Sequence, residues 1–270
     1  MISKEAKCMV LKYIEQPNGY YMSNSNHPWN IPQENISLTE NEVHVWRASL
    51  EAPLNIIYNL QNILSEEEAR RAMQFHFEVD RRHWIVAHGI LRRLLGHYLD
   101  IDPHQVRYVT NEYGKPFIVY PSHGARLHFN LSHSADLALY VFAYKRRVGV
   151  DVEYMRTDID YKALAQFHFS AYEFAQLRAL PTAMQQEAFF LCWSRKEAYI
   201  KARGEGLSIP LDQFDVSLTP GEPVALLNSR EDPQATTRWL LHGLTPGDRY
   251  AGAIVVESAG WQLSCWQWSG

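Results

Sequence analysis

The chain has 270 residues, of which 46% are hydrophobic and 21% are charged, and its formal net charge at pH 7 is -4. This composition excludes an intrinsically disordered chain, and the charge gives no general attraction for nucleic acid or anionic lipid. Three distant cysteines, Cys8, Cys192 and Cys265, exclude a disulfide framework and a cysteine-based zinc site. No apolar run matches a signal peptide or a membrane span. We therefore expect a cytoplasmic protein with no nucleic-acid or membrane partner.

The predicted elements begin after an irregular N-terminal extension, residues 1–42, which is rich in Asn, Ser and Pro and to which we assign no chemistry. Residues 43–47 alternate as a strand does, and Ser65 with Glu68 forms a capping box that opens a helix. A second helical pattern covers residues 82–98. Strand-like segments follow at residues 107–110, 116–120, 127–131 and 137–144.

The second half of the sequence repeats this order. A second strand-like segment, residues 148–151, follows residues 43–46, and a second capping box, Ser170 with Glu173, follows the first. The sequence interval is the same in both cases. Matched spacing of different element types predicts an internal duplication. We therefore expect an α+β fold of two similar lobes packed together.

The boundaries of the two lobes follow from this repeat. The N-terminal lobe is predicted to cover residues 43–146, and the C-terminal lobe residues 147–270. After a one-residue shift, residues 87–93 of the second helix correspond to residues 193–199. This alignment places Trp46 and Leu91 of the first lobe opposite Asp151 and Glu197 of the second. Acidic chemistry is therefore expected in the C-terminal lobe alone.

Two acids share one face of the strand that begins at Val148. Asp151 and Glu153 are two positions apart, so their side chains point the same way. Carboxylates at this spacing repel each other unless a cation lies between them, and hard oxygen ligands suit Mg²⁺. The alternative is a solvated edge strand. Glu197 and Lys201, one helical turn apart, form an ordinary intrahelical ion pair when taken alone.

Two further segments have polar residues next to strands. Residues 129–134 read FNLSHS and place a histidine between hydroxyls after an apolar strand, which taken alone indicates a hydroxyl-stabilised turn at the strand end. Residues 111–116 read NEYGKP and indicate a turn into the next strand, with Lys115 solvated.

Four motifs in this order resemble the 4′-phosphopantetheinyl transferases of the Sfp type. They are GKP at residues 114–116, FNLSHS at residues 129–134, VGVDVE at residues 148–153 and WSRKEAYIK at residues 193–201. The resemblance covers roughly residues 43–216. It implies a pseudo-dimer of two similar α+β halves with the active site in the cleft between them.

The activity that the resemblance implies is the transfer of phosphopantetheine from coenzyme A to a serine hydroxyl of a carrier protein, with release of adenosine 3′,5′-bisphosphate. The implied partners are apo acyl or peptidyl carrier proteins of fatty acid, polyketide or nonribosomal peptide assembly. A monomer is expected, because one chain contains both sides of the cleft. We expect the carrier to dock near residues 161–172, where Phe167 and Phe169 are predicted to be core residues.

The resemblance also implies roles for individual residues. Asp151, Glu153 and Glu197 match the Mg²⁺ ligands of the family, and Glu197 or a metal-bound water would accept the serine proton. His133 matches a histidine that donates to the pyrophosphate, and Ser132 matches a contact to the coenzyme. Lys201, Lys115 and Arg71 match basic positions, the first at the phosphates of the transferred bond and the other two near the 3′-phosphate.

Two positions limit the transfer of these roles. Trp84 occupies the place of a threonine that contacts the coenzyme in the best-known members of the family. Glu173 matches an acid of the family, but its capping distance from Ser170 explains it equally well, so we leave it out of the site.

Two other functions use the same residue types. A metal-dependent nuclease could place acids on a strand and a Glu with a Lys on another element, but the net charge and the lack of a long basic stripe count against it. A non-catalytic carrier-binding module has no evident need for three converging carboxylates and His133. Transfer of label from coenzyme A to a carrier domain distinguishes the transferase from both.

Overall fold

The computed structural model describes residues 27–32 and 36–270, so most of the predicted N-terminal extension lies outside the described residues. The first half of the described chain contains a strand, three helices, a small two-stranded hairpin and two further strands. These are β1 (Glu42–Ser49), α2 (Leu54–Asn62), α3 (Glu66–Ala72), α4 (Glu78–Leu99), β2 (Arg107–Thr110), β3 (Pro116–Tyr120), β4 (Leu127–Ser134) and β5 (Leu137–Tyr144).

The second half repeats the order of strand, three helices, hairpin and two strands. Its elements are β6 (Val148–Tyr154), α5 (Tyr161–His168), α6 (Ala171–Ala179), α7 (Thr182–Arg203), β7 (Phe214–Val216), β8 (Leu226–Ser229), α8 (Ala235–Arg238), β9 (Trp239–Leu244), β10 (Tyr250–Glu257) and β11 (Gln262–Gln267). The short α8 and the terminal β11 are additions to this order. The predicted bounds of β2, β3 and β5 are confirmed, and α4 begins before the predicted Arg82.

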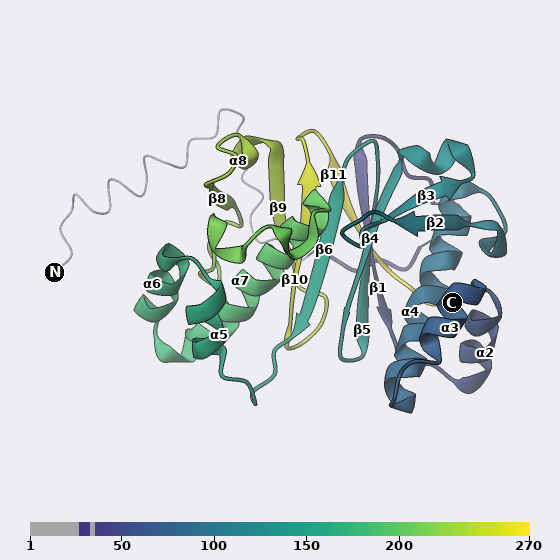
Figure 1. The fold of residues 1–270 in the computed structure, drawn as a ribbon, viewed down its shortest axis with the longest axis horizontal. Coiled ribbons are helices and arrows are strands. Elements are labelled where there is room, and N and C mark those ends of the chain that lie inside the picture. The colour runs from purple at the N-terminus through teal and green to yellow at the C-terminus, as the bar shows by residue number, and fades with distance from the viewer. Residues whose placement is uncertain (1–26, 33–35) are drawn as a thin grey trace.

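The two main sheets face each other, and the helices lie outside them (Figure 1). One sheet has the strand order β11-β1-β5-β4 and the other the order β6-β10-β9. Helices α2, α3 and α4 cover the outer face of the first sheet, and α5, α6 and α7 cover that of the second (Figure 1). Alternation along β6 sends Val148, Val150 and Val152 into the apolar layer between the sheets.

The two capping boxes are confirmed and serve the same purpose in both halves. Ser65 and Ser170 each accept a hydrogen bond from the backbone N–H of their glutamate, whose carboxylate binds the serine N–H in return. Each glutamate is also buried against a cation of the long helix. Glu68 contacts Arg92 at 2.5 Å, and Glu173 contacts Lys196 at 2.8 Å. A buried carboxylate needs such a partner, because its desolvation is otherwise uncompensated.

The long helices align differently from the sequence prediction. Both α4 and α7 contain 22 residues and end at a residue in the left-handed conformation, Asp100 and Gly204. Matching these ends pairs Arg92 with Lys196, the two cations that bind the capping-box glutamates. The same match places Arg93 opposite Glu197, so the predicted correspondence of Leu91 with Glu197 is wrong.

The terminal strand departs from the predicted division at residue 147. Strand β11 pairs in parallel with β1, with Glu42 opposite Gln262 and Arg47 opposite Gln267. It therefore completes the sheet of the first half and covers a strand edge that would otherwise have unpaired backbone groups. Among residues 27–32 and 36–270, no helix is long and apolar enough to cross a membrane.

Candidate active site

Lys201, Asp151 and Ser132 form the centre of the candidate site. They come from α7, β6 and β4, and the Lys201 ammonium donates to Asp151 Oδ1 at 2.6 Å and to Ser132 Oγ at 2.9 Å. Ser132 Oγ in turn donates to Asp151 Oδ1 at 2.8 Å. The structure thus brings together three predicted site residues that are far apart in the sequence.

Strand β4 extends through the segment that was predicted to be a turn. Asn130, Ser132 and Ser134 alternate along it and place their side chains on one face. Their oxygens accept hydrogen bonds from alternate backbone N–H groups along the edge of β6. The donors are Val150, Val152 and Tyr154, at 2.9, 3.4 and 3.1 Å. Side chains of β4 therefore replace a neighbouring strand at this edge, and the prediction of a strand-end turn is wrong.

The two serines of this row also hold the two acids of β6. Ser132 donates to Asp151, and Ser134 Oγ donates to Glu153 Oε2 at 3.1 Å. Each hydroxyl uses its proton on a carboxylate and accepts a backbone N–H with a lone pair. The sequence prediction missed Asn130 and Ser134, although the alternation of polar residues from position 130 to 134 is visible in the sequence.

Gly149 allows α7 to lie directly against β6. A Cβ atom at this position would lie 2.2 Å from the carbonyl oxygen of Ala198 and 2.3 Å from the backbone nitrogen of Ala202. Because the backbones approach this closely, the α7 face that carries Glu197 and Lys201 lies over the acids of β6. Glycine is the residue that permits such an approach.

The positive charge of Lys201 does not balance the three carboxylates of the site, whose pKa values are all raised. Asp151 is only 2% exposed, and burial raises its pKa while the Lys201 ammonium opposes this rise. Burial, followed by repulsion from Asp151, raises the pKa of Glu153 to about 7. Burial and the Asp151 charge also raise the pKa of Glu197. Asp151 Oδ2 is buried and has no hydrogen-bond partner in the described part of the chain.

The three acids interact through their charges but do not converge as a ready ligand set. Within the described residues, no three His, Cys, Asp or Glu side chains are gathered as metal ligands. The ammonium of Lys201 occupies Asp151 Oδ1 instead. Binding of a cation by all three carboxylates would therefore require side-chain rotation.

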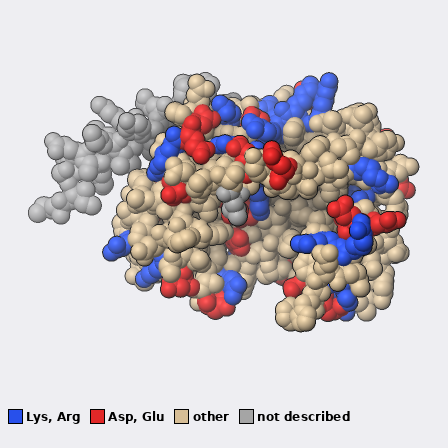
Figure 2. All heavy atoms as spheres, in the orientation of Figure 1, with Lys and Arg blue, Asp and Glu red and all other residues tan. Residues whose placement is uncertain are grey.

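His133 is exposed at the end of β4, on the side of the site that faces α4. Neighbouring protein atoms nevertheless displace water from its ring and lower its pKa, and the charges of His88 and Lys201 lower it further. His88 stacks on Trp84 with ring centroids 3.7 Å apart. Helices α4 and α7 therefore both contribute to the surroundings of His133. Figure 2 shows acidic and basic side chains together in the hollow between the two halves.

Two of the predicted basic residues, Lys115 and Arg71, do not contact the acids of the site in the described part of the chain. Lys115 is not solvated as the turn pattern indicated, because its ammonium donates to the carbonyl oxygens of Val148, Lys201 and Ala202. Arg71 is exposed on α3 and donates to Gln74 at 3.0 Å. No hydrogen bond or ion pair within the described ranges joins Arg71 to the acids.

Glu173 lies in the core of the second half. Its carboxylate accepts from the Lys196 ammonium and from the Val216 backbone N–H at 2.8 Å, and both charged side chains are fully buried. The capping explanation for this residue therefore agrees with its position, and it takes no part in the candidate site.

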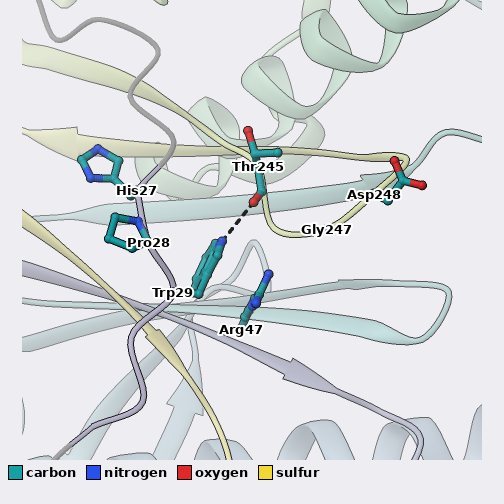
Figure 3. Close-up of a pocket in the computed structure, with 7 residues that line it drawn as sticks. All are labelled: His27, Pro28, Trp29, Arg47, Thr245, Gly247 and Asp248. Atoms are coloured by element: carbon teal, nitrogen blue, oxygen red, sulfur yellow. Dashed lines mark hydrogen bonds between the residues drawn. The ribbon is translucent and has the colours of Figure 1, made fainter.

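A cavity of about 420 Å³ lies apart from these residues. It is lined by His27, Pro28, Trp29, Arg47, Thr245, Gly247 and Asp248, none of which was predicted as a site residue (Figure 3). Trp29 donates to the Thr245 carbonyl at 2.9 Å, and the Arg47 guanidinium lies over the Trp29 ring. These contacts anchor residue 29 against the β9–β10 connection.

Comparison with known proteins gives two family models and several relatives. The model described as 4′-phosphopantetheinyl transferase superfamily matches residues 147–255, and the model described as 4′-phosphopantetheinyl transferase, N-terminal, matches residues 45–144. The 4′-phosphopantetheinyl transferase HetI of Nostoc sp. (strain PCC 7120) is 38% identical over 90% of this chain and 99% of its own length. The 4′-phosphopantetheinyl transferase Sfp of Bacillus subtilis is 32% identical over 58% of this chain and 67% of its own length.

Proposed function

The chain belongs to the 4′-phosphopantetheinyl transferase superfamily and transfers phosphopantetheine to carrier proteins, and from this premise we propose how its own residues perform the reaction. We propose that the two halves are similar α+β lobes from a duplication, residues 43–146 and 147–270, with the terminal strand exchanged into the first sheet. The site then lies between them. The contact of β4 with β6 and α7 at Asp151 is the observation that carries this proposal.

The oxygen donors of the site suit a divalent cation. A buried carboxylate oxygen without a partner is costly, and Asp151 Oδ2 is such an atom. Asp151, Glu153 and Glu197 supply the hard oxygen donors that Mg²⁺ prefers. We propose that these three residues hold Mg²⁺, which would neutralise pyrophosphate charge when bound. Removal of divalent ions with a chelator is expected to abolish transfer.

The other residues of the site bind and orient the coenzyme. We propose that Lys201 contacts the phosphates of the bond that breaks. Ser132 Oγ accepts from its ammonium at 2.9 Å, which supports this position. We propose that His133 donates to the pyrophosphate. We retain Arg71 as a proposed contact to the nucleotide 3′-phosphate, because its exposed guanidinium can exchange the contact with Gln74 for a bound anion. The aromatic pair of Trp84 and His88 then takes the place of the threonine found in the best-known members.

The chemical step requires a base for the carrier serine. We propose that Glu197 accepts the serine proton, because burial and the neighbouring Asp151 raise the pKa of its carboxyl in the metal-free protein. The serine oxygen then forms a bond to the phosphorus that carries the pantetheine, while the bond from that phosphorus to adenosine 3′,5′-bisphosphate breaks. Alignment of these groups supplies most of the acceleration in such transfers.

A direct assay tests the proposal. The protein is incubated with labelled coenzyme A, Mg²⁺ and an apo carrier domain, and we expect label on the carrier serine. A carrier with its serine changed to alanine is the control for the acceptor, and Asp151→Asn is expected to lower the rate by about 10²- to 10³-fold. Transfer by Asp151→Asn at the wild-type rate would refute the proposed site without questioning the family.

We propose that the protein acts as a cytoplasmic monomer on acyl or peptidyl carrier proteins, because one chain carries both sides of the site.

The expectation that Phe167 is a core residue is wrong, since it is 82% exposed, whereas Phe169 is 4% exposed and packs in the core. We propose that the exposed Phe167 on α5 contacts the carrier.

A further inference from the structure

The tip of the β2–β3 hairpin, residues 111–115, reaches across from the first half to the C-terminal end of α7. Asn111 Nδ2 donates to the Gly204 carbonyl at 2.7 Å. The Lys115 ammonium donates to the carbonyls of Lys201 at 2.7 Å and Ala202 at 2.8 Å. These carbonyls lack helical partners at the end of α7, and a positive charge there is favourable.

The same ammonium also holds the strand that carries the acids. Lys115 Nζ donates to the carbonyl of Val148 in β6 at 3.0 Å. A lysine ammonium has three protons, and three carbonyls accept them here. One side chain of the first half therefore joins β6 to α7, the two elements that carry the acidic residues and Lys201.

The shape of the hairpin tip depends on Asn111. Its Oδ1 accepts the backbone N–H groups of Tyr113 at 3.0 Å and Lys115 at 2.9 Å, which closes the turn and aims Lys115 at α7. Gly204 matches this tip, because a Cβ atom there would lie 2.7 Å from Lys115 Cδ. The hairpin and the helix end are thus complementary at two positions.

We propose that Lys115 and Asn111 are positioning residues for the transfer reaction: they hold the backbone of Lys201 so that its ammonium meets Asp151 and Ser132. Lys201 is held at both ends, with its carbonyl bound by Lys115 and its ammonium on Asp151. Displacement of a phosphate-binding group by about 1 Å can cost about 10²-fold in rate. The first half therefore aligns a residue of the second half without contacting the substrate.

The charge environment of Lys115 agrees with this enclosed role. Burial lowers the pKa of Lys115 to about 7, with a further contribution from Arg147. The carbonyl acceptors of α7 and β6 favour the charged form and so oppose this lowering. An ammonium that donates all three protons to backbone carbonyls has none left for a nucleotide.

The competing role for Lys115 is a contact to the 3′-phosphate of coenzyme A, and the two roles differ in what they do to substrate preference. The inference depends on the proposed transfer reaction, which the wild-type rate with coenzyme A tests first. Lys115→Met and Asn111→Asp are then assayed with coenzyme A and with 3′-dephospho-coenzyme A. Asn111→Asp keeps the acceptor that closes the turn but replaces the donor to Gly204.

We expect both variants to lower kcat by about 10- to 100-fold with either coenzyme, while KM and the preference for coenzyme A over its dephospho form stay within about twofold of wild type. Lys145→Met, which removes an exposed ammonium, is expected to behave as wild type. Loss of the preference in Lys115→Met, with kcat unchanged for dephospho-coenzyme A, would overturn the proposal. Wild-type kinetics for Asn111→Asp would overturn it as well, even if Lys115→Met does not fold.

Discussion

Single residues of the site make two hydrogen bonds at once, at least one of them to a charged carboxylate. Ser134 accepts the Tyr154 N–H and donates to Glu153, and Lys201 binds both Ser132 and Asp151. Asp151 still repels Glu153 and Glu197. Their repulsion is a stability cost that a divalent cation would remove.

Glu153→Gln provides a test of this residue-scale repulsion. The pKa of Glu153 is raised to about 7, from an ordinary value of 4.5, chiefly by burial. A raised pKa means that the carboxyl contributes stability below about pH 4.5 and that this contribution is lost as the pH rises through 7. In the presence of a chelator, Glu153→Gln should therefore raise Tm at pH 8 by about 2–4 °C, which corresponds to roughly 1 kcal/mol, and have little effect at pH 4.5.

The matched control is Glu187→Gln, which changes an exposed glutamate of α7. Its Tm should follow that of the wild type at both pH values. An unchanged or lower Tm of Glu153→Gln at pH 8 would show that the charge of Glu153 is already compensated within the protein, and the argument for a cation at this position would fail.

At the scale of elements, the site depends on the contact between α7 and β6. The methyl group that Gly149→Ala adds would lie 2.2 Å from the carbonyl oxygen of Ala198 and 2.3 Å from the backbone nitrogen of Ala202. Backbone atoms cannot move aside as a flexible side chain does, so we expect destabilisation of about 3 kcal/mol or more and loss of transfer activity. Urea unfolding measures the first effect and the carrier assay the second.

Gly247→Ala is the control for this substitution. A Cβ atom at Gly247 meets Tyr250 Cδ2 at 3.4 Å, an ordinary contact, so its stability should stay within about 0.5 kcal/mol of wild type. Equal stabilities of the two variants would mean that α7 can move away from β6 at little cost.

Helix α5 provides a second element-scale prediction. Phe167→Ala removes a side chain that is 82% exposed, so we expect an unchanged Tm and an unchanged KM for coenzyme A. If Phe167 contacts the carrier, KM for the carrier should rise by about 10-fold, as is typical for an aromatic anchor at an interface. Tyr58→Ala on α2, also an exposed aromatic residue, should leave all three quantities unchanged. A carrier KM that does not move would place the docking surface elsewhere.

In the molecule as a whole, the C-terminal strand β11 pairs with β1, the first strand of the described chain. Strand β11 pairs with β1 over six residues, and Cys265 is buried between the sheets. We expect removal of residues 261–270 to lower the free energy of unfolding by several kcal/mol and to promote aggregation, because β1 would become an exposed edge. Removal of residues 269–270 alone should change neither. Equal thermal stability of the longer truncation and the full chain would contradict this account of β11.

Local patterns in the sequence predicted local structure well. Alternation identified β1 and β6, and the capping pairs of Ser65 and Ser170 located the starts of α3 and α6. The acids of β6 and the Glu197–Lys201 face of α7 were also found in this way. The alignment of α4 with α7 failed by contrast, because it depends on the lengths of loops and on which buried cation meets Glu68 or Glu173.

Periodicity and capping within the sequence determined the order of strands and helices, because they act between residues that are near in the chain. The family and the kind of reaction followed from the resemblance of four motifs to the 4′-phosphopantetheinyl transferases. Only the tertiary structure decided that Lys115 binds the end of α7, that Asn130 and Ser134 complete the edge of β6, and that β11 joins the first sheet. These contacts join residues far apart in sequence. A lysine or a serine has the same donors wherever it stands, and the folded chain alone determines which acceptors it meets.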